Sequence, residues 1–380
     1  MLYCAKALRL FAYGSASIAL PAQLIALHVL PVWIGTVLAA ALCMGAAQML
    51  FTNRLTRRFG STAVGVTAAI GMALGGLLTV SGALTLTIVA AALGILNASS
   101  QEIGPFLPLE QVALAVPDGG TARLALYNAV GTGALALGTA AGGALPFTVT
   151  FLLYAACGAG IAILYRLAGL PKSARAAVPH PVMPRVGISE QLAALFAVDA
   201  FAGGLVVQGF IAYWFLTRFH ASASMVGFIL SAGNILSALS LPAAAWCGKR
   251  FGLLNTMVFT HLPSNILLAA IPFAPTLPAA AALLLARFSL SQMDVPTRQA
   301  FVVAIVPEDQ RVHAAAVTSA ARPVAAAASP LLSGLAMQFA GAGIPFFAAG
   351  GIKACYDLAI YFWFRDKRIP ARSEPQLRIR

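Results

Sequence analysis

The sequence predicts an all-α membrane protein with twelve transmembrane helices in two pseudo-symmetric six-helix halves. Three observations predict this class: an apolar composition, a series of long apolar segments, and motifs that return at a nearly constant distance. Of the 380 residues, 60% are hydrophobic and only 9% are charged, whereas about a quarter of a soluble domain is charged. The composition therefore argues against a water-soluble fold.

Apolar segments of the length needed to cross a bilayer follow one another along the whole chain. A helix needs about 20 residues to cross roughly 30 Å of hydrocarbon, and unbroken apolar runs favour helices over a membrane β-barrel. We expect the first run to remain as a span, because no small-residue cleavage site follows it. The twelve expected spans begin near Leu8, Val32, Ser61, Leu84, Thr121, Phe147, Gln191, Ser222, Gly252, Pro278, Val312 and Gly343.

Basic residues gather on alternate connections between these segments. Lys6 and Arg9 precede the first expected span, three arginines follow the second, and Arg218 stands on the opposite set of connections. The positive-inside rule therefore predicts a multi-pass protein of an inner or plasma membrane with both termini in the cytoplasm. The net charge of +13 is interpreted as a topology signal, and we expect no binding of nucleic acid.

Several short motifs occur twice. "SQEIGP" at 100–105 returns as "SQMDVP" at 291–296, and three further matches keep an offset of 190 to 192 residues. We therefore expect a first half at 1–168, a cytoplasmic linker at 169–190, a second half at 191–366 and a basic cytoplasmic tail at 367–380. Five scattered cysteines without a C-x-x-C pair are interpreted as packing residues.

Two parallel six-helix halves resemble the major facilitator superfamily, in which the substrate site lies between the halves near the midplane. The resemblance extends to "NRLTRRFGS" after the second span and to "GKRFG" after the eighth. It also includes "GTGALALGTAAGG" in the fifth span, which is similar to the antiporter motif of the family. The residues expected to take part in gating or in these motifs are Arg57, Arg58, Gly60, Lys249, Arg250, Gly252, Arg322, Gly138 and Gly142.

Charged side chains lie within the apolar tenth segment. Arg287, Ser291, Asp294 and Arg298 are spaced i, i+4, i+7 and i+11, which places them on one face of a helix. Charges at this depth normally face a partner or a water-filled cavity, so we expect the stripe to line the substrate pathway, with Pro296 loosening the helix. A structural ion pair between Asp294 and Arg298 is an equal alternative.

Other ionisable residues are also expected at membrane depth. Glu102, in the fourth span with Glu110 nearer the cytoplasm, has no cation among its sequence neighbours and is the first candidate for carrying a proton. Asp199 and Asp294 are further candidates, and Arg322 is a possible partner of Asp199. We expect Lys353 and Asp357 to form a structural pair and His261 to pack rather than bind metal. The remaining pathway candidates are Asn97, Gln101, Tyr13, Gln23, Gln208 and Tyr213.

These features favour a secondary transporter that moves a small solute by alternating access. We expect a monomeric, proton-coupled exporter of drugs or metabolites, without cofactor or bound metal, whose partners are the solute, protons and the bilayer. The alternative is a proton-coupled symporter for a nutrient or small organic anion, with Arg287 and Arg298 binding the anionic group. A receptor or an enzyme is less favoured, since no nucleotide loop, Ser-His-Asp set or H-E-x-x-H motif occurs.

Overall fold

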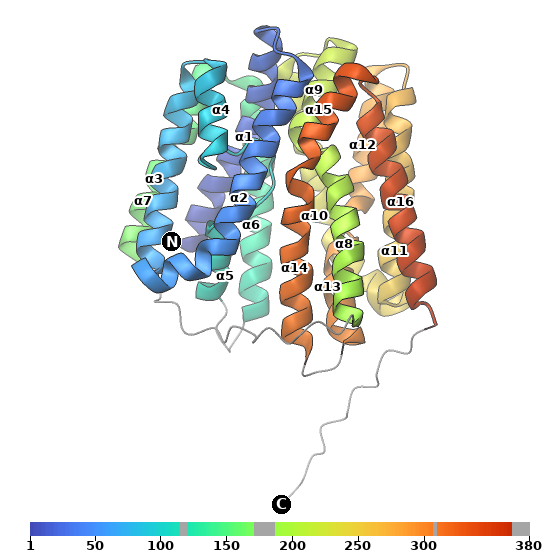
Figure 1. Ribbon diagram of the computed structural model, residues 1–380. Coiled ribbons are helices and arrows are strands. Elements are labelled where there is room, and N and C mark those ends of the chain that lie inside the picture. The colour runs from blue at the N-terminus through green and yellow to red at the C-terminus, as the bar shows by residue number, and fades with distance from the viewer. Residues whose placement is uncertain (115–119, 171–186, 307–309, 367–380) are drawn as a thin grey trace, which may run out of the picture.

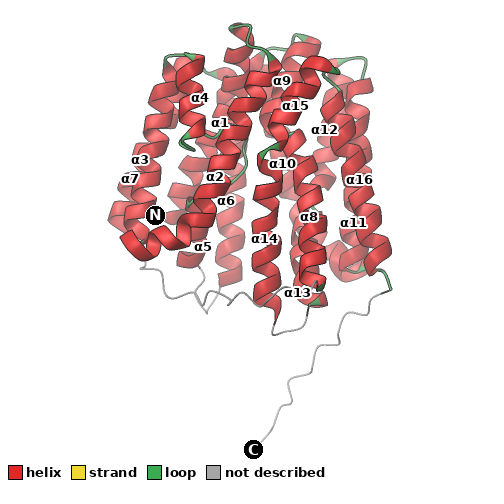
Figure 2. Cartoon of the chain, viewed as in Figure 1, coloured by secondary structure: helices red, strands yellow, loops and turns green. Residues whose placement is uncertain are grey.

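The computed structural model describes residues 1–114, 120–170, 187–306 and 310–366. All regular elements in these ranges are helices (Figure 2), so the predicted all-α class is confirmed. Most of the expected linker and the basic tail lie outside the described residues.

The first half of the chain contains the helices labelled α1 to α7, and two of them, α4 and α5, together make the fourth expected span. Their bounds are α1 Leu2–Ala26, α2 Pro31–Phe59, α3 Ser61–Val80, α4 Leu84–Ala92, α5 Phe106–Leu114, α6 Gly120–Ala144 and α7 Phe147–Ala168.

The second half contains the helices labelled α8 to α16, in which the seventh, tenth and eleventh expected spans each consist of two helices. Their bounds are α8 Ile188–Leu205, α9 Gln208–Phe219, α10 Ala223–Phe251, α11 Leu253–Ala270, α12 Leu277–Ser291, α13 Asp294–Ile305, α14 Arg311–Ala327, α15 Ser329–Phe339 and α16 Ile344–Phe364, with a short 3₁₀ helix at Ile271–Phe273 after α11.

The two halves stand side by side (Figure 1). Helices α3, α4 and α7 lie on the left of the view, α11, α12 and α16 lie on the right, and α2, α6, α10 and α14 lie between them. In all four divided spans one helix lies in the upper part of the bundle and the other in the lower part. The four interruptions therefore lie near the middle height of the bundle. At this depth of a membrane, irregular backbone is tolerated only where it is buried in protein or lines a cavity.

The interruption of the fourth span is the longest. Residues 93–105 form no helix, and Gly94, Ser100 and Gly104 have φ angles of 67°, 61° and 134°, values that a right-handed helix cannot contain. Asn97, Gln101 and Glu102 therefore lie on unwound backbone, and the expected helical position of Glu102 in the fourth span is wrong.

The tenth span is interrupted at Gln292 and Met293, between α12 and α13. Pro296 has no N–H with which to bond the carbonyl of Gln292 four residues earlier, so the predicted loosening near Pro296 is confirmed. The stripe expected along one helix is therefore divided, with Arg287 and Ser291 on α12 and Asp294 and Arg298 on α13. The repeated "SQ…P" motif marks the place where both the fourth and the tenth spans lose their helix.

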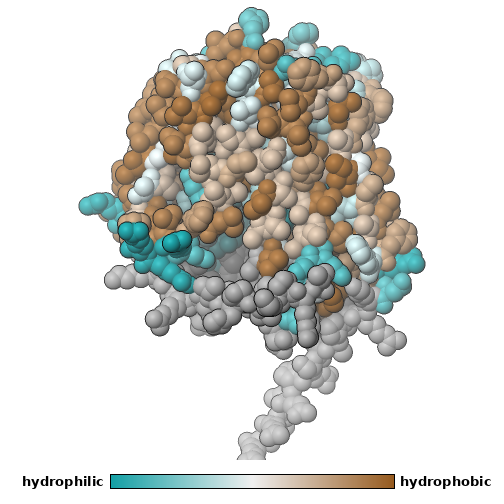
Figure 3. All heavy atoms as spheres, in the orientation of Figure 1, coloured by the Kyte–Doolittle hydropathy of each residue, from teal (hydrophilic) through white to brown (hydrophobic). Residues whose placement is uncertain are grey.

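The outside of the bundle is apolar. Figure 3 shows a broad hydrophobic band over the sides and hydrophilic residues towards the lower edge. Six described segments are long and apolar enough to cross a membrane by themselves, and α2, with 29 residues, is about 43 Å long at 1.5 Å per residue. The surface is that of a protein embedded in lipid.

Two pairs of glycines join the halves. A methyl group added at Gly35 on α2 would lie 3.1 Å from Gly334 Cα on α15, and one added at Gly143 on α6 would lie 3.1 Å from Gly227 Cα on α10. The pairs are related by the sequence repeat, because Gly227 follows Gly35 by 192 positions and Gly334 follows Gly143 by 191. Small residues let helix backbones approach closely in membranes, so these pairs hold the halves together.

Candidate functional site

Arg9 on α1 is the centre of a buried network in the first half. Its two terminal nitrogens donate to the two carboxylate oxygens of Glu110 on α5, at 3.0 and 2.7 Å. The hydroxyls of Tyr127 on α6 and Tyr165 on α7 also donate to Glu110. This two-pronged, charge-assisted contact is the strongest geometry available to an arginine and a carboxylate.

Glu102 belongs to the same network. Lys6 Nζ donates to Glu102 Oε2, and Arg9 Nη2 lies 3.2 Å from Glu102 Oε1. The expectation of an unpaired carboxyl at Glu102 is therefore wrong, because helix α1 brings two cations to it from about a hundred positions away. Lys6 and Arg9 lie inside α1 and are 1% exposed, so the expectation that they precede the first span is wrong.

Asp199 on α8 is the centre of a second network, built from four helices of the second half. It accepts from Arg322 Nη1 on α14 at 2.8 Å and from Lys353 Nζ on α16 at 2.5 Å. Arg298 Nη1 on α13 lies 3.5 Å from the same carboxylate and also donates to Asp294. The proposed partnership of Asp199 with Arg322 is present, and so is the pairing of Asp294 with Arg298.

Asp357 extends this network to His261 and Asn265, two partners that the sequence did not indicate. Its two oxygens lie 2.8 Å from His261 Nδ1 and 2.8 Å from Asn265 Nδ2, and His261 Nε2 is 3.8 Å from Asp199. The expected pair of Lys353 and Asp357 is therefore wrong, since Lys353 turns to Asp199. His261 links two carboxylates, and the described residues contain no group of three or more His, Cys, Asp or Glu that could hold a metal.

A cavity of about 300 Å³ lies between the two networks. The first half contributes residues of α2, α5 and the unwound segment, and the second half contributes residues of α8, α14 and α16. Its polar lining consists of Gln101, Glu102, Asp199, Ser319, Arg322 and Lys353. The cavity is therefore bounded by both halves and carries charged groups from each.

Only some of these groups are accessible from the cavity. The side chain of Glu102 is 25% exposed and that of Arg322 is 31% exposed. The carboxylates of Glu110, Asp199, Asp294 and Asp357 are at most 4% exposed. Glu102 is thus the networked carboxylate that water and solute can reach, and Arg322 is the corresponding cation.

Hydrogen bonds cross between the halves near α9. Gln208 Nε2 donates to Ser17 Oγ on α1 at 2.9 Å and to Thr139 Oγ1 on α6 at 3.1 Å. Asn234 Nδ2 on α10 donates to the Gln208 carbonyl oxygen at 3.3 Å. All four residues are buried. Gln208, expected in the substrate pathway, therefore makes a polar contact that holds the halves together.

The other predicted site residues are dispersed. Arg287 Nε and Ser291 Oγ are buried without a hydrogen-bond partner among the described residues, and neither residue lines the cavity between the halves. Tyr13 and Asn97 line a different pocket within the first half. Gln23 and Tyr213 are partly buried on α1 and α9 and do not line the central cavity.

The residues of the expected gating motifs lie where α2 and α10 end. Gly60 and Gly252 have almost the same backbone, with φ of 86° and 87°, because each ends a helix and starts the next one. Arg57, Arg58, Lys249 and Arg250 are exposed in the last turns of these helices. Added methyl groups at Gly138 and Gly142 on α6 would collide with the backbone of Phe11 and Ser15 on α1. The absence of side chains at these two glycines therefore allows α6 to pack closely against α1.

Two helical halves with a charged cavity between them form an arrangement typical of secondary transporters. The family model described as the Major Facilitator Superfamily matches residues 192–378. Over 88% of its length the chain is 24% identical to the uncharacterized membrane protein YJR124C of Saccharomyces cerevisiae, 87% of which is covered.

Solved structures share the fold over nearly the whole chain. The nucleoside transporter NupG superposes with a TM-score of 0.73 at 14% identity and covers 96% of this chain and 98% of its own. The inward-open xylose transporter XylE from E. coli gives 0.69 at 15%, covering 95% and 94%. The human organic anion transporter MFSD10 gives 0.69 at 16%, covering 94% and 97%. The resemblance expected from the sequence is confirmed: residues 192–378 match the Major Facilitator Superfamily, and nearly the whole chain shares its fold with solved transporters.

Proposed function

We propose that the chain moves a small solute by alternating access through the cavity between its halves, as a proton-coupled exporter. The observation that carries the proposal is the accessible carboxylate of Glu102 in a cavity bounded by both halves. Secondary transporters place substrate and coupling-ion sites near the midplane at the interface between repeats.

Glu102 can couple proton and solute because its partners are cations. While it is ionised, it neutralises Lys6 and part of the charge of Arg9. A proton on Glu102 removes that neutralisation and leaves Lys6 without its partner in a poorly hydrated site, which changes the stability of the first-half network. A proton and a solute that contacts Glu102 would then alternate at the same group.

Export as the direction rests on α6. The glycines of α6 resemble the antiporter motif. They allow α6 to pack closely against α1, the helix that carries Lys6 and Arg9. A change of packing at Glu102 would thus be transmitted to a helix that also contacts the second half through Gly143.

Symport of a small organic anion is the second candidate, and the accessibility of Arg322 favours it. An arginine that presents part of its guanidinium to a cavity is suited to binding a carboxylate or phosphate. A neighbour of the same fold is named an organic anion transporter. In this case Arg322 and Lys353 would bind the anion, in place of the expected Arg287 and Arg298.

Purified protein in vesicles with an imposed pH gradient tests the proposal. A panel of a nucleoside, a pentose, an organic anion and an uncharged aromatic amine would be offered on one side. For an exporter we expect one solute to move against the direction of proton flow, whereas movement with protons would establish the symporter. No gradient-dependent flux for any of these solutes would contradict both.

The orientation in the membrane is proposed from the basic residues at the ends of α2 and α10. Arg57, Arg58, Lys249 and Arg250 are exposed there, which favours the cytoplasmic side for this edge of the bundle. A cysteine replacing Ser173 in the expected linker should react with an impermeant thiol reagent only after cells are opened. Labelling of this cysteine in intact cells would show that the linker lies outside the cell and would contradict the proposed orientation.

A further inference from the structure

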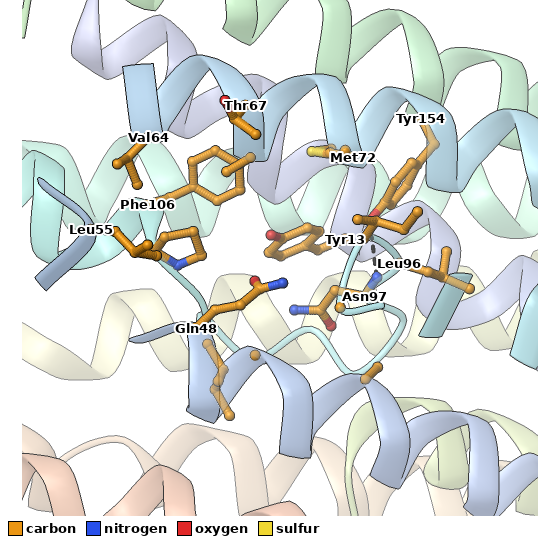
Figure 4. Close-up of a pocket in the computed structure, with 18 of the residues that line it drawn as sticks. Tyr13, Gln48, Leu55, Val64, Thr67, Met72, Leu96, Asn97, Phe106 and Tyr154 are labelled. Carbon is orange, nitrogen blue, oxygen red and sulfur yellow. Dashed lines mark hydrogen bonds between the residues drawn. The ribbon is translucent and has the colours of Figure 1, made fainter. Parts of the chain in front are cut away.

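A second cavity of about 560 Å³ lies within the first half (Figure 4). It is bounded by α2, α3 and the unwound segment 93–105, with side chains from α1 and α7 at its inner wall. Its lining includes the aromatic residues Tyr13, Phe106 and Tyr154 and the polar residues Gln48, Thr67 and Asn97.

The lining of this pocket differs from that of the central cavity. None of its described lining residues is an aspartate, glutamate, lysine or arginine. Tyr13, Phe106 and Tyr154 provide aromatic walls, and Figure 4 shows the side chains of Tyr13, Gln48 and Asn97 directed towards one region of the pocket. Sites for small molecules are typically 300–1,000 Å³ in volume, mainly apolar and aromatic, with a few placed polar groups.

The pocket opens near the end of α2 on one side and borders the central cavity on the other. Near its outer edge Leu55 is 38% exposed and Phe59 is 58% exposed. On the inner side Ile103 lines both this pocket and the central cavity. The unwound segment is therefore the partition between a surface pocket and the charged cavity.

We propose that this pocket binds an uncharged, aromatic small molecule. Charge complementarity decides the class, because an ionic group would have no oppositely charged partner in the lining and would lose its hydration. A lipid acyl chain fits less well, since it offers no donor to the amide oxygen of Gln48, whose nitrogen already donates to the Leu93 carbonyl. If the proposed transport function holds, the pocket is the point from which such a solute passes Ile103 into the central cavity.

Binding of N-phenyl-1-naphthylamine to the purified full chain tests the pocket independently of transport. The probe is uncharged and aromatic, and its fluorescence rises in an apolar site. We expect saturable binding to the natural chain and at least tenfold weaker binding to Ala68→Phe, which fills the pocket from α3. Ile70→Phe is the matched control, since Ile70 lies on the same helix, is 49% exposed and does not line the pocket.

A second variant covers the case in which Ala68→Phe does not fold. Gln48→Leu keeps the volume but removes the amide, and we expect about three- to tenfold weaker binding. Absence of saturable binding by the natural chain, or unchanged binding by both variants, would overturn the proposal. Saturable binding in a protein that shows no solute flux in vesicles would retain the pocket and reject the transport function.

Discussion

Arg9 and Asp199 occupy matching positions of the two halves, 190 residues apart, and carry opposite charges. Each is the centre of the ion-pair network of its own half: Arg9 contacts two carboxylates, and Asp199 contacts three cations. The two halves therefore have an ion-pair network at the same place, but its central residue is a cation in the first half and a carboxylate in the second. As a result the cavity between the halves has an accessible carboxylate on one side and an accessible cation on the other.

Loss of the Asp199 charge is expected to destabilise the second half. Asp199→Asn leaves Lys353 and Arg322 without a carboxylate, and removal of one partner from a buried ion pair costs about 3–5 kcal/mol. The thermal midpoint of the purified protein in detergent should fall clearly. Asp366→Asn is the matched control, because Asp366 also pairs with an arginine but is 86% exposed, so its midpoint should not change. Equal midpoints for the two variants would contradict a structural network at Asp199.

Glu110 and Glu102 should differ in what they support. Glu110→Gln breaks the two-pronged contact with Arg9 in a fully buried site, so we expect a marked loss of thermal stability. Glu102→Gln alters a carboxylate that is partly exposed to the cavity, so the loss should be smaller. Thermal midpoints measured side by side check the order, and a larger loss for Glu102→Gln would reverse the assignment of Glu110 as the structural member.

Glycines between the halves should control opening on the side where α2 and α15 meet. Gly334→Ala would place a methyl 2.6 Å from the carbonyl oxygen of Pro31, so the closed arrangement becomes less stable. A cost of about 1.4 kcal/mol would change the ratio of closed to open molecules tenfold. Spin labels at Leu30 and Phe339, both exposed, in a background with the five cysteines replaced, should report a longer distance.

The control for this experiment is Gly351→Ala, because an added methyl at Gly351 meets nothing within 4 Å. Its label distance should equal that of the unsubstituted background. A distance that stays unchanged in Gly334→Ala would show that the glycine contact does not limit opening.

The hydrogen bonds that Gln208 makes between the halves should also affect how far the two halves open. Gln208→Leu removes the donor to Ser17 and Thr139 and one of the two acceptors of Asn234 Nδ2, at a cost of about 1–3 kcal/mol for the unsatisfied groups. We expect the same spin-label pair to show more of the long distance. If instead the distances stay the same and solute affinity falls, Gln208 belongs to the binding site as the sequence suggested.

The fold could be predicted because membrane-spanning helices are recognised in a sequence by long apolar segments. Apolar length gives the spans, and the offset between "SQEIGP" and "SQMDVP" gives the two halves. The unwound backbone at 93–105 was hidden by the same apolar composition, since hydropathy does not distinguish a helix from irregular backbone buried in protein. Positive φ at Ser100, a residue that is not glycine, could not be read from its type.

The site could be predicted only in part because its contacts join distant spans. The ion pair of Asp294 and Arg298, one of the two alternatives for these residues, could be predicted because their spacing along one helix is local. Lys6 and Arg9 were assigned to the membrane edge by their position near the start of the chain. A signal was available: Arg9 stands where the repeat places Asp199, a residue already recognised as buried.

Proton movement by the natural chain and by Glu102→Gln in vesicles tests the coupling most directly. A pH-sensitive dye inside the vesicles would follow protons while a solute identified in the panel moves across the membrane. We expect the natural chain to move protons with each transported solute, and Glu102→Gln to exchange solute at equal pH without moving protons. Proton movement in Glu102→Gln equal to that of the natural chain would contradict the role of Glu102 as the coupling carboxylate.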